Sequence, residues 1–352
     1  MSAEPQSPAA ASEVDLGALA DALRPELGSM MSVERLIPIS IGASNRMFRA
    51  ESSAGPLIIR VPPVHKTSPT AHDVGREFRV LRALDDTDVP HPRAIALCSD
   101  PTPFGVGFLV MELVDGFNLK VGLDTPYAPT VGERREFAFA AVAALAEIAA
   151  VDWKAVGLGD YGRPAGFLDR QVDRWIKQLD GYRIRDLDGL DDLAQWLADN
   201  RPAAAPPALM HGDFTFMNVM FAKSRPAQVA AIVDWEQSTI GDPLLDLGWF
   251  VGLWAHADEE SPATTPGDRW VTQLDGMPTR AEIVQHYAER SGRDVSAMSF
   301  YQALALFKLA VVLEGNYAKY ARGTSRNAHH ADFEWMVPRL ISTALSATRG
   351  ER

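Results

Sequence analysis

Three polar residues in the second half of the chain are spaced so that their side chains could act together. Asp213 and Asn218 are five residues apart across a short loop, and Asp234 closes the next β-like run, residues 229–233. Phosphoryl transfer to a hydroxyl needs a carboxylate that orients the acceptor and takes its proton, and hard oxygen ligands that hold Mg²⁺. A polar turn followed by an ordinary strand end is the plain alternative. The ordered set of three oxygen donors favours a phosphoryl-transfer site.

The segment around these residues resembles the catalytic core of the aminoglycoside phosphotransferase family, which is related in fold to choline kinases and protein kinases. The resemblance is carried by HGDFTFMN at residues 211–218 and IVDWEQSTIGDPLLDLG at residues 232–248, and it covers roughly residues 35–255. It implies that Asp213 is the catalytic base and that Asn218 and Asp234 bind the metal, Mg²⁺. It also implies that His211 packs against the loop and orients it.

Residues in the first third of the chain match the nucleotide-binding positions of the same family. The turn IGASNR, residues 41–46, resembles the loop that positions the nucleotide, and Ser44 and Asn45 would lie over its phosphates. The resemblance also implies that Arg60 holds phosphate and pairs with Glu77 from the next helix. Most kinases have Lys in place of Arg60. Arg is familiar in the branch that includes phosphotransferase domains fused to acyl-CoA dehydrogenases.

The apolar run FLVMELVDG, residues 108–116, resembles the hinge that binds adenine in kinases. Met111 would lie behind the base, while the carbonyl of Glu112 and the N–H of Val114 would hydrogen-bond to it. A buried strand that ends in a turn is the plain alternative, and it is compatible because hinge contacts use backbone atoms. The predicted cofactors are therefore ATP and Mg²⁺.

Two acids near residue 243 have a structural explanation. Asp242 precedes Pro243, and this pair is typical of a helix start because Asp accepts the free N–H groups and Pro fits the first helical turn. Asp246 is a candidate brace for the catalytic loop. We expect both residues to be architectural.

The acceptor site is predicted only as a set of candidates that would lie between the catalytic loop and the C-terminal helices. Its candidate wall residues are Asp173, Trp175, Trp249, Trp254, Glu314 and Tyr317. The acids at 258–260 could meet a polyamine-like substrate, although an exposed loop explains them better. The partner expected here is a small-molecule hydroxyl acceptor. Aminoglycosides are the namesake substrates, and amino alcohols, sugars, macrolides and lipidic alcohols stay open.

Two other functional classes fit parts of the sequence. Arg60 in place of Lys is the single feature that supports a non-catalytic, nucleotide-binding pseudokinase, and the presence of Asp213, Asn218 and Asp234 argues against it. A protein kinase is disfavoured because the chain has no multi-glycine loop. It also passes from residues 234–236 directly into residues 241–243, without room for an activation segment.

The helices and strands that carry these residues are predicted to form an α+β protein with a two-lobed, protein-kinase-like fold. A small N-terminal lobe with an antiparallel sheet plus a helix is expected from strand-like runs at 35–40, 46–51, 57–61, 94–98 and 107–114, with helices at 14–27 and 71–84. The rest reads as mostly helical, at 134–151, 170–179, 190–200 and from 243 onward. We therefore expect a flexible tail at 1–12, a nucleotide-binding lobe at 13–115, and a catalytic and substrate-binding lobe at 116–352.

Composition narrows the class of protein. The 352 residues are 47% hydrophobic, enough for a core, and a net charge of −12 argues against a dedicated nucleic-acid binder. The single cysteine, Cys98, excludes an intrachain disulfide and a multi-cysteine metal site. His329 and His330 have no third ligand spaced with them. The most apolar helical stretch, residues 137–151, is too short for a membrane span. We expect a cytoplasmic protein with no membrane, nucleic-acid or protein partner.

Overall fold

The computed structural model describes residues 14–39, 46–63, 73–263, 268–325 and 327–351. The expected tail at 1–12, Ser44 and Asn45 lie outside these residues. The chain divides into two compact units. The first runs to Asp115 and also contains Ala231–Glu236, and the second contains Gly116–Ala230 and Gln237–Arg352. The boundary at residue 115 agrees with the expected one. The return of residues 231–236 to the first unit was not expected.

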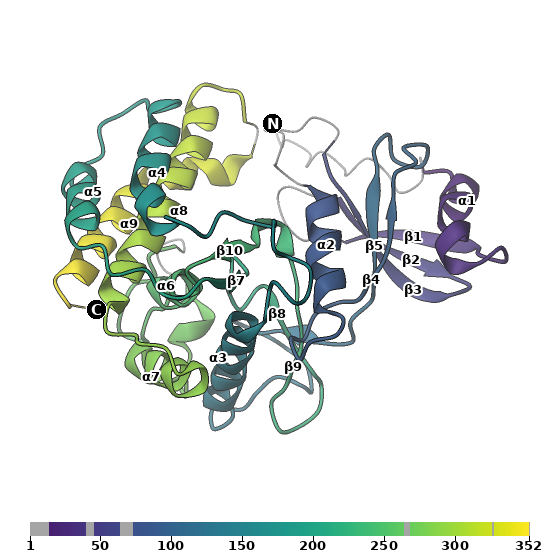
Figure 1. Ribbon diagram of the computed structural model, residues 1–352, viewed down its shortest axis with the longest axis horizontal. Helices are drawn as coiled ribbons and strands as arrows, with labels where there is room; N and C mark the ends of the chain where they lie inside the picture. The colour runs from purple at the N-terminus through teal and green to yellow at the C-terminus, as the bar shows by residue number, and fades with distance from the viewer. Residues whose placement is uncertain (1–13, 40–45, 64–72, 264–267, 326, 352) are drawn as a thin grey trace. The chain divides into compact units, whose positions relative to one another are not determined.

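The first unit is built on a five-stranded antiparallel sheet with the order β1-β2-β3-β5-β4 (Figure 1). Its strands are β1 Val33–Ile39, β2 Arg46–Ser52, β3 Gly55–Val61, β4 Ala94–Cys98 and β5 Phe108–Glu112. Gly55, with φ of 93°, allows the tight turn between β2 and β3. The alternation of buried and exposed side chains along β2 and β3 buries Phe48, Ala50, Leu57 and Ile59.

Two helices accompany this sheet, each started by an aspartate that accepts backbone N–H groups. In α1, Leu16–Leu27, Asp15 is the cap, and Leu19 and Leu23 join the core of the sheet. In α2, Val74–Leu84, Asp73 is the cap. The buried face of α2 carries Glu77, and a carboxylate on an apolar face requires a partner.

The second unit is mostly helical (Figure 1). Its α-helices are α3 Arg134–Ala150, α4 Gln171–Asp180, α5 Leu190–Asp199, α6 Leu244–Gly252, α7 Arg280–Ser291, α8 Met298–Ala321 and α9 Phe333–Thr348, with 3₁₀ turns η2 Leu168–Arg170, η4 Val271–Gln273 and η5 Ala328–Asp332. The helix α8 packs against α4, α5, α6 and α9 and is the centre of this unit.

Short strands frame the loops that carry the predicted chemistry. Strand β7, Ala208–Met210, pairs antiparallel with β10, Thr239–Gly241. A second sheet has the order β6-β8-β9, with β6 Phe117–Asn118, β8 Val219–Phe221 and β9 Val229–Ile232. The residues from 211 to 218 therefore leave one short strand and enter another. The α+β prediction, with a sheet and helix first and helices after, is confirmed.

The most apolar long helix is α8, and not the 137–151 stretch singled out from the sequence. By length and composition it could cross a membrane, but most of its apolar window is buried inside the protein. A helix that is hydrophobic on nearly every face is typical of a protein core. We therefore assign α8 as the core helix of the second unit.

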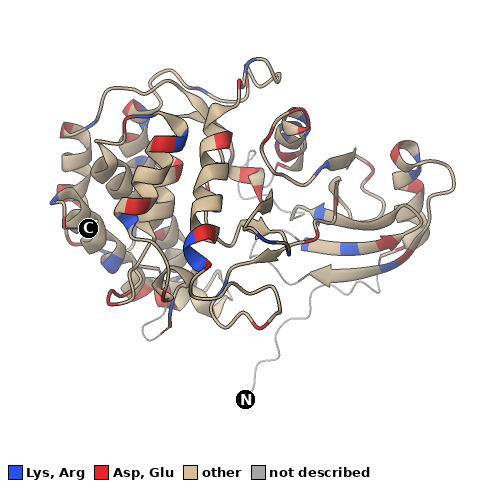
Figure 2. Cartoon of the chain, turned by 90° about the horizontal axis from the view of Figure 1, so that it is seen from below, with Lys and Arg blue, Asp and Glu red and all other residues tan. Residues whose placement is uncertain are grey.

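Charged residues are interspersed in sign along the ribbon (Figure 2). Many form exposed pairs, such as Arg35 with Glu51, Arg225 with Glu133 and Arg135 with Glu282. Exposed pairs of this kind contribute little to stability. The buried charges are the informative ones, and several of them gather around the predicted catalytic residues.

Candidate active site

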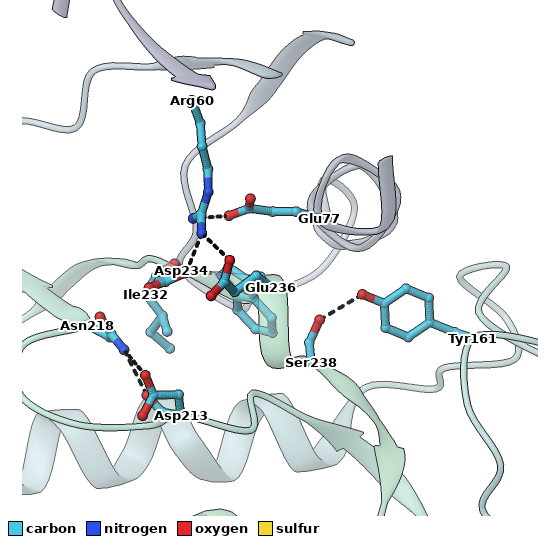
Figure 3. Close-up of polar contacts among 10 residues, drawn as sticks. Arg60, Glu77, Tyr161, Asp213, Asn218, Ile232, Asp234, Glu236 and Ser238 are labelled. Carbon is cyan, nitrogen blue, oxygen red and sulfur yellow. Dashed lines mark hydrogen bonds and ion pairs between the residues drawn. The ribbon is translucent and has the colours of Figure 1, made fainter. Parts of the chain in front are cut away.

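Arg60 is the buried centre of a charge cluster in the first unit. Its side chain, 6% exposed, projects from β3, and its Nη1 lies 2.8 Å from Oε1 of Glu77. The ion pair expected between these two residues is therefore present. Nη2 lies 2.8 Å from Oδ1 of Asp234 and 2.8 Å from Oε2 of Glu236 (Figure 3). One guanidinium thus meets three carboxylates.

Burial and charge oppose each other in this cluster. Burial raises the pKa of Glu77 to about 7, although the charge of Arg60 opposes that rise. Burial lowers the pKa of Arg60, but the carboxylates of Glu77, Asp234 and Glu236 outweigh it, so the pKa is raised overall. Arg60 stays charged, and its charge is what allows a carboxylate to be buried in α2.

Asp234 has an unusual backbone. Its φ is 68°, and it is the one non-glycine residue with positive φ in the described ranges. It follows β9 directly and precedes the 3₁₀ turn η3, Trp235–Gln237, where the indole N–H of Trp235 donates to the carbonyl of Ile232 at 2.8 Å. Left-handed backbone at a non-glycine residue is strained and gathers at functional sites. The turn directs the carboxylate of Asp234 to Arg60.

Asp213 and Asn218 lie at the two ends of one loop in the second unit. The side-chain amide of Asn218 donates from Nδ2 to the backbone carbonyl of Asp213 at 2.8 Å and to its Oδ2 at 3.2 Å (Figure 3). The donor side of the amide is therefore used to hold Asp213. Oδ1 is left as the atom suited to a hard cation.

Asp246 braces this loop from α6, as the sequence suggested. Its carboxylate accepts the N–H of His211 at 2.6 Å and that of Gly212 at 2.9 Å. Burial raises the pKa of Asp246 to about 6, against the lowering effect of these two hydrogen bonds. Gly212 has φ of 84°, and a Cβ there would collide with the carbonyl of Gln237. Nδ1 of the buried His211 accepts the N–H of Asp213 at 3.3 Å, which is the orienting role expected of it.

Three further residues hold the loop or its supports and were not found from the sequence. Lys308, from α8, donates from Nζ to the carbonyl of Gly212 at 3.1 Å. Asn118, from β6, donates from Nδ2 to the carbonyls of Met217 and Val219. The hydroxyl of Tyr301 donates to Asp242 at 2.8 Å.

Asp242 itself is buried and accepts the N–H of Leu244 at 3.1 Å, so it caps α6 as expected. The same carboxylate also ties the start of α6 to α8, through its bond with Tyr301. The capping pattern in the sequence could reveal the first role and not the second.

The residues expected to form the hinge lie where β5 ends. Met111 is buried in β5, and Glu112 closes the strand, with its side chain accepting the N–H of Arg93 at 2.9 Å. Val114 follows after the strand, and within the described part of the chain its N–H has no hydrogen-bond partner. A backbone N–H without a partner just after a buried strand is a suitable donor for a heterocycle.

The candidate acceptor residues do not form one group in the structure. Trp175 and Trp249 flank Lys308, next to the catalytic loop, at 5.9 and 4.6 Å from Nζ to each ring centre. Trp254 is fully buried against Phe216 and Phe250, as a core residue.

The other acceptor candidates have structural partners or are exposed. Glu314 is buried and bound by Arg185, whose guanidinium stacks on Tyr317, while Asp173 is exposed. In the acidic run at 258–260, Glu259 pairs with Arg280 and Glu260 with Arg339. These residues are explained without a substrate.

Residues 35–283 match the APH family, described as the phosphotransferase enzyme family. The chain belongs to this family. The resemblance seen at residues 211–248 is therefore confirmed. The family assignment makes the chain a kinase-like, small-molecule phosphotransferase.

Known proteins are similar to most of this chain. Acyl-CoA dehydrogenase family member 11 of Gallus gallus is 31% identical over 316 residues, which are 88% of this chain and 40% of that protein. The chain thus spans about two-fifths of that relative. A crystal structure from Ralstonia eutropha, provisionally named an aminoglycoside phosphotransferase, is 29% identical with a TM-score of 0.78 and covers 96% of this chain and 99% of the other.

More distant solved structures share the fold alone. A thermostable mutant of aminoglycoside phosphotransferase APH(4)-Ia, in complex with ADP and hygromycin B, is 15% identical with a TM-score of 0.58, covering 94% of this chain and 98% of the other. The kinase-like fold expected from the sequence is therefore confirmed.

Proposed function

We propose that this phosphotransferase uses ATP and Mg²⁺ to transfer the γ-phosphate to a hydroxyl of a small organic molecule. The observation that carries the proposal is the braced loop, in which Asn218 holds Asp213 and Asp246 holds the backbone just before it. Such a loop fixes a carboxylate for an acceptor hydroxyl, and positioning is most of what phosphoryl transfer asks of a protein.

Each residue has a role in this proposal. Asp213 orients the acceptor hydroxyl and takes its proton. Oδ1 of Asn218 and the carboxylate of Asp234 would hold Mg²⁺, which neutralises phosphate charge when bound. Both are hard oxygen ligands, and the strained φ of Asp234 fits a residue held for a function.

The nucleotide is proposed to bind through the first unit. Arg60, held by Glu77, supplies a fixed positive charge for phosphate. Met111, Glu112 and Val114 would hold adenine. Ser44 and Asn45 belong to the proposed phosphate loop as well, on the family resemblance alone.

Two acceptor classes are supported by different observations. An aminoglycoside, and with it a role in antibiotic resistance, is supported by the similarity to the Ralstonia eutropha protein. A metabolite is supported by the curated relatives, which are named as acyl-CoA dehydrogenase family members and match most of this chain. A cytoplasmic location fits the single, buried, free thiol of Cys98.

The test is a transfer assay with γ-labelled ATP, Mg²⁺ and a panel of hydroxylated acceptors. The panel holds aminoglycosides, amino alcohols, sugars, macrolides and hydroxylated acyl thioesters, with GTP as an alternative donor. Label that moves to one acceptor class supports the proposal and names the substrate. Nucleotide binding without transfer to any acceptor, or to water, would instead support a non-catalytic nucleotide-binding protein.

A further inference from the structure

Lys308 reaches the catalytic loop from a helix almost a hundred residues further along the chain. It lies in the middle of α8, and its Nζ donates to the carbonyl oxygen of Gly212 at 3.1 Å. Gly212 immediately precedes Asp213. All of these residues belong to the second unit.

The ammonium group of Lys308 lies in a site that suits a cation. Its Nζ is 4.6 Å from the ring centre of Trp249 and 5.9 Å from that of Trp175, which are cation–π distances. Burial lowers the pKa of Lys308, and the negative charges of Asp213 and Asp246 act to raise it. The pKa is lowered overall, so the aromatic faces and carboxylates offset only part of the loss of water around the charge.

The hydrogen bonds of Lys308 and Asp246 complement each other. Asp246 accepts the N–H of Gly212 at 2.9 Å, and Lys308 donates to the carbonyl of the same residue. Both backbone groups of Gly212 are therefore held by charged side chains from two different helices. Glycine adopts more backbone conformations than other residues, so these two bonds help to fix Gly212 at φ of 84°. Its carbonyl belongs to the peptide bond that leads into Asp213.

We propose that Lys308 is a positioning residue for phosphoryl transfer, which fixes the peptide between Gly212 and Asp213 and so directs the Asp213 carboxylate. This inference rests on the proposed function. Lys308 acts through the backbone of the loop. The residues around its ammonium group are Trp175, Trp249 and Asp246. A filler of the helix interface would need neither a charge nor a donor at this position.

The test compares Lys308→Met, which keeps length and apolar volume, with Lys308→Arg, which keeps the charge and the donors. Lys319→Met, on the exposed face of the same helix, is the matched control. We expect kcat to fall about 10- to 100-fold in Lys308→Met, because a small misplacement of a catalytic group has effects of this size. The KM for ATP should stay unchanged, Lys308→Arg should recover part of kcat, and Lys319→Met should match the wild type.

Amide hydrogen exchange gives a readout that does not depend on activity. In Lys308→Met, the peptide that covers residues 211–214 should exchange faster, while peptides of α8 should keep the wild-type rate. Unchanged kcat and unchanged loop exchange would overturn the inference. Faster exchange throughout α8 with a lower melting temperature would also overturn it, since that is the result of a purely structural residue.

The two proposals can fail separately. If the wild-type protein transfers phosphate to no acceptor, yet Lys308→Met selectively loosens residues 211–214, the proposed function fails while the positioning of Asp213 by Lys308 stands. If the wild type is active and Lys308→Met is equally active, the proposed function stands and the role of Lys308 is refuted.

Discussion

Arg60 meets three carboxylates with a single guanidinium, and Glu77 lies on the apolar face of α2 because that positive charge is there. The second unit has the same feature at its catalytic loop, where Asp246 is buried against two backbone N–H groups and the ammonium of Lys308 lies near it. At the scale of single residues, Glu77 and Asp246 are thus buried carboxylates whose partners can be removed one at a time.

Removing Arg60 should show that the burial of Glu77 depends on the positive charge of Arg60. We expect Arg60→Met to lower the free energy of unfolding by about 3–5 kcal/mol, the cost of leaving a buried carboxylate without its partner. The double variant with Glu77→Gln should recover part of that loss. The measurement is urea unfolding without nucleotide, with Arg35→Met as the control for an exposed pair. If Arg60→Met lowers the free energy of unfolding no more than the control does, Arg60 does not compensate for a buried charge on Glu77.

Asp246 should make stability depend on pH. Its pKa in the folded protein is about 6, above its ordinary value of 3.8, so the folded state binds the proton more tightly than the unfolded state. The contribution of Asp246 to the free energy of unfolding is fully present below its ordinary pKa and is lost as pH rises through about 6. The free energy of unfolding of the wild type, minus that of Asp246→Asn, should therefore fall between about pH 4 and about pH 7. A difference that stays flat over this range would contradict the assignment, because both proteins share all other titrating groups.

Residue-level roles could be read from the sequence only where a motif fixes them. The pair of Arg60 and Glu77 follows from family register, and Asp246 from its place near a helix start. Glu236 could not be paired with Arg60, because the 3₁₀ turn after Asp234 decides which way it faces. Lys308 could not be connected to Gly212, because that contact depends on how α8 packs.

At the scale of elements, α6 connects the loop at residues 211–218 to the core helix α8. Its Asp246 holds the loop, its Asp242 is bound by Tyr301 of α8, and its Gly248 lies directly against the α8 backbone. A Cβ built on Gly248 would lie 2.5 Å from the carbonyl oxygen of Tyr301. Close approach of these two helices therefore requires glycine at this position.

This contact gives a prediction with a control in the same helix. Gly248→Ala should destabilise the protein by about 1–3 kcal/mol, because the extra methyl forces α6 away from α8. It should also lower kcat, since Asp246 moves with α6. In Gly252→Ala the new Cβ would meet Leu306 at 3.4 Å, an ordinary contact, so stability should change little. Equal effects of the two substitutions in a melting experiment would refute the close-packing argument.

Element boundaries were predictable where local patterns were strong. Strands β2 and β4 alternate more buried and less buried residues, and both were predicted close to their observed ranges. The helices predicted at 14–27 and 71–84 end where expected, and they begin two and three residues later, after the capping Asp15 and Asp73. In the second unit, α8 is apolar on nearly every face, so its sequence could not show which side meets a neighbour. For the same reason Trp254 and Glu314 were candidates for the acceptor site, although they are buried in the core and in an ion pair with Arg185.

At the scale of the whole molecule, the predicted α+β architecture holds, and the chain forms two compact units. One detail was not predictable: residues 231–236 return to the first unit and bring Asp234 and Glu236 to Arg60. Strand β9, Val229–Ile232, therefore contributes residues to both units. The curated relatives are longer than this chain, so the activity proposed here is that of the phosphotransferase part they share with it.

In the proposed function, Asp213 accepts the proton of a hydroxyl while phosphate is transferred from ATP. The most direct measurement is γ-phosphate transfer to the acceptor found in the screen, comparing the wild type with Asp213→Asn at saturating nucleotide. We predict that kcat falls at least about 100-fold, as expected for loss of a general base, while nucleotide affinity stays the same. Transfer by Asp213→Asn at the wild-type rate would contradict the account.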